Sequence, residues 1–303
     1  MTKSLSVIIP TFNPHPGRLA ETLNSLRKQT LPIENWELIL IDNKSTKPIE
    51  VDLSWHPSAI MLREERQGLT FARLKGFEAA NGDTIVMVDD DNILDKDYLK
   101  NMAALFDINT NLGTAGGKLV PRFESRPPSW LKPFYGNLAL RDLGESTIIS
   151  QWDNSYPSHA PVGAGMGIRR EALTEYCADA KASRSQIVDR TAGQLGSGGD
   201  NDIVITTLKA GWQTGYFPEL SLTHIIPQAR TEFSYVCRLV NHTGRSWIAV
   251  LEKHQINPWA KISRWTVPIR KAKAWVKLRA WASKENYIRW QGACGQFDGL
   301  ATI

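Results

Sequence analysis

The sequence predicts an α/β protein with a mostly parallel central sheet, helices on both of its faces, and a basic helical C-terminal extension. Two observations predict this fold. Short apolar runs of strand type alternate with segments of helical apolar spacing along the first part of the chain. From about residue 231 the pattern becomes continuously helical, and then basic and rich in tryptophan.

The individual elements follow from periodicity and from residues that stop an element. Leu19, Leu23 and Leu26 have helical spacing, and Asn81-Gly82 ends a second helical segment. Later segments predict a hairpin formed by Trp212–Phe217 and Leu220–His224, and one amphipathic helix over 267–284. Before these we expect strands at Ser4–Ile9, Glu37–Ile41, Ala59–Leu62 and Thr84–Val88, and helices at 19–30, Leu69–Ala80 and Lys96–Phe106.

Polar and acidic side chains follow three predicted strands at the point where each strand ends. They are Thr11-Phe12-Asn13, Asp42-Asn43 and Asp89-Asp90-Asp91. Ligands of open α/β sheets bind outside the carboxyl ends of the strands, so this edge is expected to carry a site. Adjacent carboxylates repel one another, and Mn²⁺ or Mg²⁺ would offset that repulsion. The alternative is that the aspartates cap the following helix.

Composition limits the class of protein. The chain has 303 residues, of which 42% are hydrophobic and 22% charged, values ordinary for a globular protein. Its three cysteines form no C-x-x-C pair, which argues against a disulfide framework and a zinc knuckle. No secretory signal and no apolar run of membrane-spanning length is recognised. We therefore expect a cytoplasmic protein, which is peripheral on the cytoplasmic face of the membrane if its basic extension meets lipid.

Four motifs resemble the family 2 glycosyltransferases. They occur in family order across about 90 residues, and weaker similarity continues to about Arg230. A single D-x-D is uninformative, but four ordered motifs are specific. The motifs are Ser6-Val7-Ile8-Ile9-Pro10-Thr11-Phe12-Asn13, Ile41-Asp42-Asn43-Lys44-Ser45-Thr46, Gly68-Leu69-Thr70-Phe71-Ala72-Arg73 and Val88-Asp89-Asp90-Asp91-Asn92.

The resemblance implies a GT-A fold and a role for each matching position. We expect a nucleotide-sugar-binding and catalytic domain over 1–230 and a helical extension over 231–303. Asp91 is expected to hold the metal ion that bridges the donor diphosphate, and His224, after the last predicted strand, is a second expected ligand. For His224 a structural role is the alternative. The donor-binding residues implied are Pro10, Thr11, Phe12, Asn13, Asp42, Arg73, Asp89 and Asp90.

The segment Gly198-Gly199-Asp200-Asn201-Asp202 resembles a later family motif, in which a carboxylate deprotonates the acceptor hydroxyl. The match places Asp200 in this role. The chain departs from the family pattern because Gly199 stands where Glu is usual, and a shifted register would select Asp202 instead. The alternative for Asp200 is a helix cap, although capping and catalysis are compatible.

These features together predict a metal-dependent, inverting glycosyltransferase that uses a nucleotide sugar, most often a UDP sugar in such enzymes. The acceptor is expected to be a glycan or a lipid-linked molecule. Two alternatives remain open at this level. One is a sugar-nucleotide nucleotidyltransferase, although Thr11–Gly17 lacks the chemistry of a triphosphate-binding loop. The other is a degenerate, non-catalytic subunit that binds a glycan or a nucleotide.

The C-terminal extension carries its own charge pattern. Nine basic residues and one acidic residue lie between Trp259 and Gln291, giving this segment a formal charge of +8 and the rest of the chain −3. Six of the eleven tryptophans also lie between residues 247 and 290. A basic, Trp-bearing helix favours an anionic membrane surface, contacted through residues 261–289. The alternative is packing on the catalytic domain. Nucleic acid is not expected, because no nucleic-acid module accompanies the charge.

Overall fold

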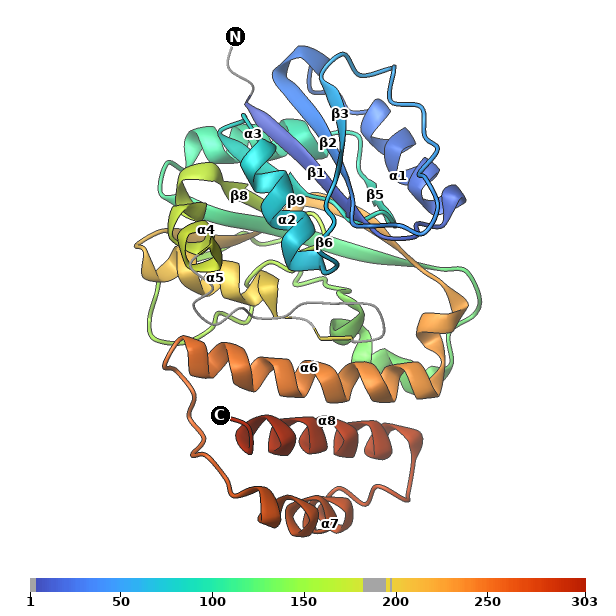
Figure 1. Ribbon diagram of the computed structural model, residues 1–303, viewed down its shortest axis with the longest axis vertical. Coiled ribbons are helices and arrows are strands. Elements are labelled where there is room, and N and C mark those ends of the chain that lie inside the picture. Colours follow the sequence, from blue (N-terminus) through green and yellow to red (C-terminus); the bar gives the residue numbers. More distant parts are fainter. Residues whose placement is uncertain (1–3, 182–194, 197) are drawn as a thin grey trace.

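The computed structural model describes residues 4–181, 195–196 and 198–303. Within these residues a nine-stranded sheet occupies the upper part of the molecule in Figure 1, and three long helices are stacked below it. The strands are β1 (Leu5–Thr11), β2 (Trp36–Asp42), β3 (Ala59–Arg63), β4 (Thr84–Met87), β5 (Asn92–Leu94), β6 (Leu112–Phe123), β7 (Ile148–Ser150), β8 (Gly167–Arg169) and β9 (Gln213–Ile226).

Helices cover both faces of the sheet. Val7 and Ile9 of β1 point to one face and pack with α1 and α3, whereas Ile8 points to the other face and packs with α2 and α5. Burial on both faces explains why the first strands are continuously apolar. The helices are α1 (Pro16–Arg27), α2 (Leu69–Ala79), α3 (Tyr98–Ile108), α4 (Thr174–Lys181), α5 (Gly199–Lys209), α6 (Phe233–Lys253), α7 (Val267–Lys277) and α8 (Lys284–Leu300).

The strand order is β3-β2-β1-β4-β8-β6-β9-β5, and β7 pairs with β9. The four strands β3, β2, β1 and β4 are parallel, so their carboxyl ends meet at one edge. In the other half, β8 and β5 run antiparallel to their neighbours. The sequence therefore predicted the parallel strands β1 to β4. The antiparallel strands β5 and β8 come from segments in which the alternation of apolar residues is weak.

Two strand predictions are wrong in detail. The hairpin expected over 212–224 is one strand, β9, which runs parallel to β6. Pro218 interrupts the apolar pattern, but the chain does not turn back there. The pairing of β9 with β6 shifts its register opposite Gly116 and Lys118, and the strand then continues in the same direction. Strand β1 also continues through Pro10 to Thr11, whose carbonyl oxygen accepts a hydrogen bond from the Asn43 amide at 2.8 Å.

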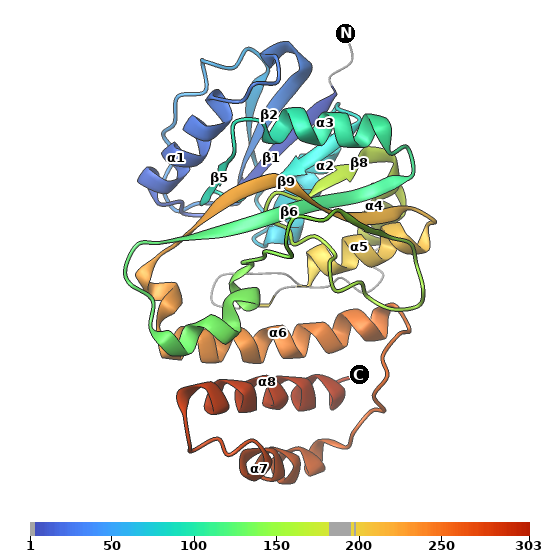
Figure 2. The ribbon, with the colours of Figure 1, turned by 180° about the vertical axis from the view of Figure 1, so that it is seen from behind.

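The C-terminal helices form a layer that is anchored to the rest of the protein. Val236 and Leu239 of α6 share a buried cluster with Leu131 and Phe134 of the 3-10 segment η2 (Ser129–Leu138). Helix α8 packs along α6, and α7 packs on α8, as both views in Figures 1 and 2 show. A boundary near residue 230 stays a prediction, because this cluster spans it.

The single helix expected over 267–284 is also wrong. Helix α7 ends at Lys277, and Arg279 then adopts a left-handed conformation with φ of 49°. A new helix begins after Ser283, whose hydroxyl accepts a hydrogen bond from the Asn286 amide at 3.1 Å. Serine at an N-cap satisfies a backbone donor that the first helical turn leaves unpaired. Among the described helices, none combines the length and apolarity needed to cross a bilayer.

Close approach of α6 and α8 depends on glycine. A Cβ on Gly295 would collide with the carbonyl oxygen of Asn241, which belongs to the backbone of α6 and cannot rotate away. We therefore expect Gly295→Ala to lower the free energy of unfolding by about 1–3 kcal/mol, the usual cost of overpacking. Urea denaturation measures this change.

The matched control is Gly136→Ala, because a Cβ at Gly136 would meet nothing within 4 Å. This variant should unfold within about 0.5 kcal/mol of the parent, as surface substitutions usually do. Equal stability of Gly295→Ala and Gly136→Ala would show that α6 and α8 are not packed as described.

Candidate active site

A cavity of about 400 Å³ opens at the carboxyl ends of the parallel strands. Its size lies within the range of small-molecule binding sites. Nine of the residues that the sequence singled out line it together: Pro10, Thr11, Phe12, Arg73, Asp89, Asp90, Asp91, Asp200 and His224. Residues from five separated segments of the chain therefore meet in one place.

The three consecutive aspartates form the turn between β4 and β5. The expectation that they cap a helix is wrong, because α3 begins only at Tyr98, after β5. The side chain of Asn92 holds this turn by accepting a hydrogen bond from the Asp89 amide at 3.0 Å. Removal from water, followed by repulsion from Asp91, raises the pKa of Asp90 to about 7. Thr11 donates a hydrogen bond to Asp90 and opposes this shift.

Asp91 meets His224 because of a strand pairing. Asn92 of β5 lies opposite His224 of β9, and the amide of Ile225 donates to the Asp91 carbonyl oxygen at 2.9 Å. This brings the Asp91 carboxylate to 3.3 Å from Nε2 of His224. His224 is 1% exposed. The two residues that the sequence proposed as metal ligands are thus adjacent, although 133 positions separate them in the chain.

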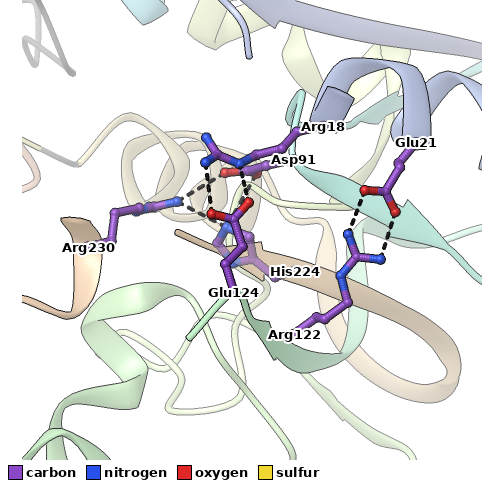
Figure 3. A network of polar contacts seen from close by, with 7 residues as sticks. All are labelled: Arg18, Glu21, Asp91, Arg122, Glu124, His224 and Arg230. Atoms are coloured by element: carbon purple, nitrogen blue, oxygen red, sulfur yellow. Dashed lines mark hydrogen bonds and ion pairs between the residues drawn. The ribbon is translucent and has the colours of Figure 1, made fainter. Parts of the chain in front are cut away.

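Arg230, in the 3-10 turn η4 (Gln228–Thr231), contacts both of these residues. Its Nη1 donates to Asp91 Oδ2 at 3.1 Å and lies 3.2 Å from His224 Nε2 (Figure 3). Burial opposes the charge of Arg230, but Tyr235 and Asp91 more than offset it and hold its pKa above the ordinary value. The carboxylate and the imidazole therefore turn their acceptor atoms toward one cation.

The donor set suits a divalent ion that is shared with a ligand. Asp91 and His224 offer one carboxylate and one imidazole, a combination that Mn²⁺ accepts. Within the described ranges, no group of three His, Cys, Asp or Glu side chains forms a complete protein cage. Ions that bridge diphosphates are held by one or two protein ligands plus phosphate oxygens, so two ligands are sufficient here.

Two ion pairs fasten α1 to the end of β6 beside this cluster, as Figure 3 shows. Arg18 pairs with Glu124 through two contacts of 2.8 and 3.0 Å, and Arg122 pairs with Glu21 through two contacts of 2.7 Å. Bidentate pairing fixes orientation as well as distance. The positive charge of Arg18 also acts on Asp91. It therefore adds positive potential at the cluster formed by Asp91, His224 and Arg230.

Arg73 and Asp200 both lie beside Gly163 on another part of the cavity wall. The amide of Gly163 donates to Asp200 Oδ2 at 3.0 Å. A Cβ on Gly163 would lie 2.6 Å from Nη2 of Arg73, at the end of a flexible side chain, so a larger residue here would displace the guanidinium. Asp200 is partly exposed in the first turn of α5, which leaves its carboxylate accessible from the cavity.

Asp202 has a different environment. It is 2% exposed and accepts hydrogen bonds from Lys253 Nζ and His254 Nε2, both at 2.7 Å. Both partners lie at the C-terminal end of α6. Asp202 does not line the cavity and joins α5 to α6 instead, so the structure separates two carboxylates that the sequence could not tell apart.

Two predicted residues lie outside the cavity lining. Asn13 is exposed and accepts hydrogen bonds from the amide and hydroxyl of Thr46 at 2.9 and 3.0 Å. Asp42 accepts from Arg63 at 2.6 Å and from the Ser45 amide at 2.8 Å. Their neighbour Asn43 does line the cavity, together with Gln67, Gly68, Leu69, Ala139, Gly163, Ala164 and Arg230. Of these, Asn43, Gly68 and Leu69 belong to the motifs that the sequence analysis matched, and Arg230 lies at the end of the weaker similarity.

Comparison with protein families matches residues 6–177 to the model of glycosyl transferase family 2. A glucosyl-dolichyl phosphate glucuronosyltransferase of Haloferax volcanii is 23% identical over 177 residues, covering 56% of this chain and 54% of that protein. An N-acetylglucosaminyltransferase of Azorhizobium caulinodans is 26% identical over 235 residues, covering 75% and 56%. The chain thus spans about half the length of these curated relatives.

Solved structures agree on the fold. The mannosyltransferase PcManGT from Pyrobaculum calidifontis, solved with GDP-Man and Mn²⁺, has a TM-score of 0.56 at 18% identity, covering 97% of this chain and 74% of its own. S. aureus TarS in complex with UDP has a TM-score of 0.53 at 16% identity, covering 99% and 90%. The family model covers more than half of the chain, and with the GT-A fold it establishes that this protein is a glycosyltransferase of family 2.

Proposed function

We propose that the protein transfers a sugar from a nucleoside diphosphate sugar, with Mn²⁺ or Mg²⁺ at Asp91 and His224, and with Asp200 as the base. The transfer inverts the configuration at the sugar carbon. The observation that carries this proposal is the arrangement of one cavity. Its wall includes the Asp91–His224–Arg230 cluster, and it also carries an accessible carboxylate at Asp200.

The cationic side of the cavity suits a departing nucleoside diphosphate. A divalent ion at Asp91 and His224 supplies Lewis acidity toward the diphosphate oxygens when it is bound. Arg230 and Arg73 line the same cavity and place guanidinium groups near that charge. Preorganised cations stabilise negative charge most where water is excluded. Phe12 and Pro10, at the end of β1, offer an apolar wall for the nucleotide base.

Asp200 is suited to accept a proton from the acceptor hydroxyl. The hydroxyl must lose its proton as it attacks the sugar, so a carboxylate has to face the attacking side. The Gly163 amide holds one oxygen of Asp200, which fixes the orientation of the carboxylate toward the cavity. The Asp202 carboxylate already accepts hydrogen bonds from Lys253 and His254, so Asp202 positions α5.

The names of relatives suggest the substrate class. The PcManGT structure holds a guanosine donor and the TarS structure holds UDP, so both bases occur among proteins of this fold. We propose a UDP sugar as donor. The relative from Haloferax volcanii is named for a dolichyl phosphate acceptor, which supports a glycan or lipid-linked acceptor here. Family membership leaves no reason to retain the nucleotidyltransferase alternative.

The metal assignment predicts a change in nucleotide binding. Asp91→Asn removes the anionic ligand of a hard cation, so the gain in UDP affinity that Mn²⁺ produces should fall by about tenfold or more. Calorimetric titration of UDP with and without Mn²⁺ measures this gain. Asp83→Asn, an exposed carboxylate at the opposite end of β4, is the control and should keep it. A full Mn²⁺ effect in Asp91→Asn would refute the assignment.

The base assignment predicts a loss of turnover without a loss of donor binding. In Asp200→Asn, release of UDP from the preferred UDP sugar in the presence of acceptor should fall about 10²–10⁴-fold, the scale for removing a general base. Its affinity for UDP should stay near that of the parent. Screening UDP sugars with Mn²⁺ and without acceptor first identifies the donor by its slow hydrolysis.

Asp202→Asn separates catalysis from stability. It leaves Lys253 and His254 without their carboxylate, so the free energy of unfolding should fall by about 3–5 kcal/mol, as for a broken buried ion pair. Its turnover, measured well below its melting temperature, should exceed that of Asp200→Asn. If Asp202→Asn is stable but inactive while Asp200→Asn turns over normally, the two roles are reversed.

A further inference from the structure

Large exposed apolar side chains are concentrated at one end of the molecule. Of the twelve among the described residues, five lie between Trp259 and Trp281. They are Trp259 (45% exposed), Trp265 (76%), Ile269 (53%), Val276 (63%) and Trp281 (58%). Scattered exposed apolar residues need no explanation, but a cluster confined to one short segment indicates an interaction surface.

The two faces of helix α7 differ in what they contact. Trp275 turns inward, with ring centroids 4.8 Å from Trp290 and 5.9 Å from Tyr287 of α8. Lys271 on the same side pairs with Asp298 at 2.7 Å. The packing alternative for this segment therefore accounts for Trp275, one of the tryptophans of the basic segment. It does not account for Ile269 and Val276, which point away from α8.

The outward face of α7 combines apolar and basic side chains. Ile269 and Val276 are seven positions apart, two turns along the same side of a helix, and the exposed Trp265 lies in the 3-10 turn (Arg264–Thr266) that leads into α7. Arg270, Lys273 and Lys277 are exposed along the flank of this row. The sequence contains no acidic residue between Trp259 and Lys284 to neutralise them. We call these six side chains the α7 outer face.

The α7 outer face belongs to the layer farthest from the sheet. In Figures 1 and 2 the order along the long axis is sheet, α6, α8 and α7. The cavity lies at the carboxyl ends of the parallel strands, and none of its lining residues comes from α7. A large flat partner can therefore contact α7 without covering the active-site cavity.

We propose that the α7 outer face docks the protein on the surface of an anionic lipid bilayer. Its row of Trp265, Ile269 and Val276 would enter the boundary between headgroups and acyl chains, and the flanking basic residues would meet lipid phosphates. A second copy of the chain fits less well, because a twofold contact would set these basic rows against each other. Nucleic acid would use the charges but would leave Ile269 and Val276 exposed.

Two forces act together on this surface. Each basic residue near an anionic bilayer strengthens binding about fivefold, and salt screens this attraction within a Debye length of about 10 Å at 0.1 M. Burial of Ile269 and Val276 adds a contribution that salt does not weaken. Binding should therefore require anionic lipid, fall as salt rises, and depend on both kinds of side chain.

Co-sedimentation with vesicles tests the proposal on the full chain. The protein should pellet with vesicles of phosphatidylglycerol and phosphatidylcholine, and at least tenfold less with pure phosphatidylcholine. Replacing Arg270, Lys273 and Lys277 by Gln should lower the partition coefficient about 100-fold. Ile269→Ser and Val276→Ser should each lower it about tenfold. Because these residues are exposed, none of the changes should shift the melting temperature appreciably.

Controls matched in charge and polarity make the result specific. Lys28, Lys47 and Lys100 are exposed elsewhere, so changing all three to Gln removes the same charge and should preserve binding. Ile108, 78% exposed at the end of α3, provides the apolar control, because Ile108→Ser removes the same kind of side chain elsewhere and should preserve binding. The variant Asp200→Asn should bind vesicles normally, which keeps this test independent of the proposed catalysis.

Three outcomes would overturn the proposal. Equal loss of binding in the two triple variants would mean that net charge alone attracts the protein to lipid. Equal partitioning to anionic and neutral vesicles would remove the role of the basic residues. Absence of vesicle binding, with a dimer in analytical ultracentrifugation that Ile269→Ser dissociates, would assign the surface to a second copy of the chain.

Discussion

The antiparallel pairing of β5 with β9 is the contact on which the active site depends. It joins a three-residue strand directly after the aspartate run to the last strand of the sheet, and it sets Asn92 opposite His224. Asp91 then has its carbonyl oxygen bonded to β9 and its carboxylate beside the imidazole. Backbone pairing thus fixes the positions of both residues, and Arg230 contacts both of their side chains.

The arginines around the cavity offset the negative charge of its carboxylates. Three consecutive carboxylates lie between β4 and β5, and the pKa of Asp90 rises to about 7 because burial and the neighbouring aspartates oppose its ionisation. Arg230, Arg73 and Arg18 reach the same region from η4, α2 and α1. A nucleoside diphosphate would bring further negative charge, which a divalent ion would then balance.

The C-terminal helices also support the proposed base, although they lie outside the cavity. Lys253 and His254, at the end of α6, hold Asp202 in the first turn of α5. Asp200 lies in the same turn, two residues earlier, so α6 fixes the start of the helix that carries it. The helical layer thus has an inner side that positions the active site and an outer side, on α7, that is free for a partner.

The sequence by itself determined the parallel half of the sheet and the helices on both faces, because period-two and helical apolar patterns are local and parallel strands bring their carboxyl ends to one edge. Its resemblance to the family 2 glycosyltransferases implied half of the residues that line the cavity. Only the tertiary structure decided the pairing of Asp91 with His224 and Arg230, and the separation of Asp200 from Asp202. It also turned Trp275 inward and left Ile269 exposed. Each of these depends on contacts between segments far apart in the chain, such as β5 with β9 or α5 with α6, and periodicity within one segment carries no information about its distant neighbour.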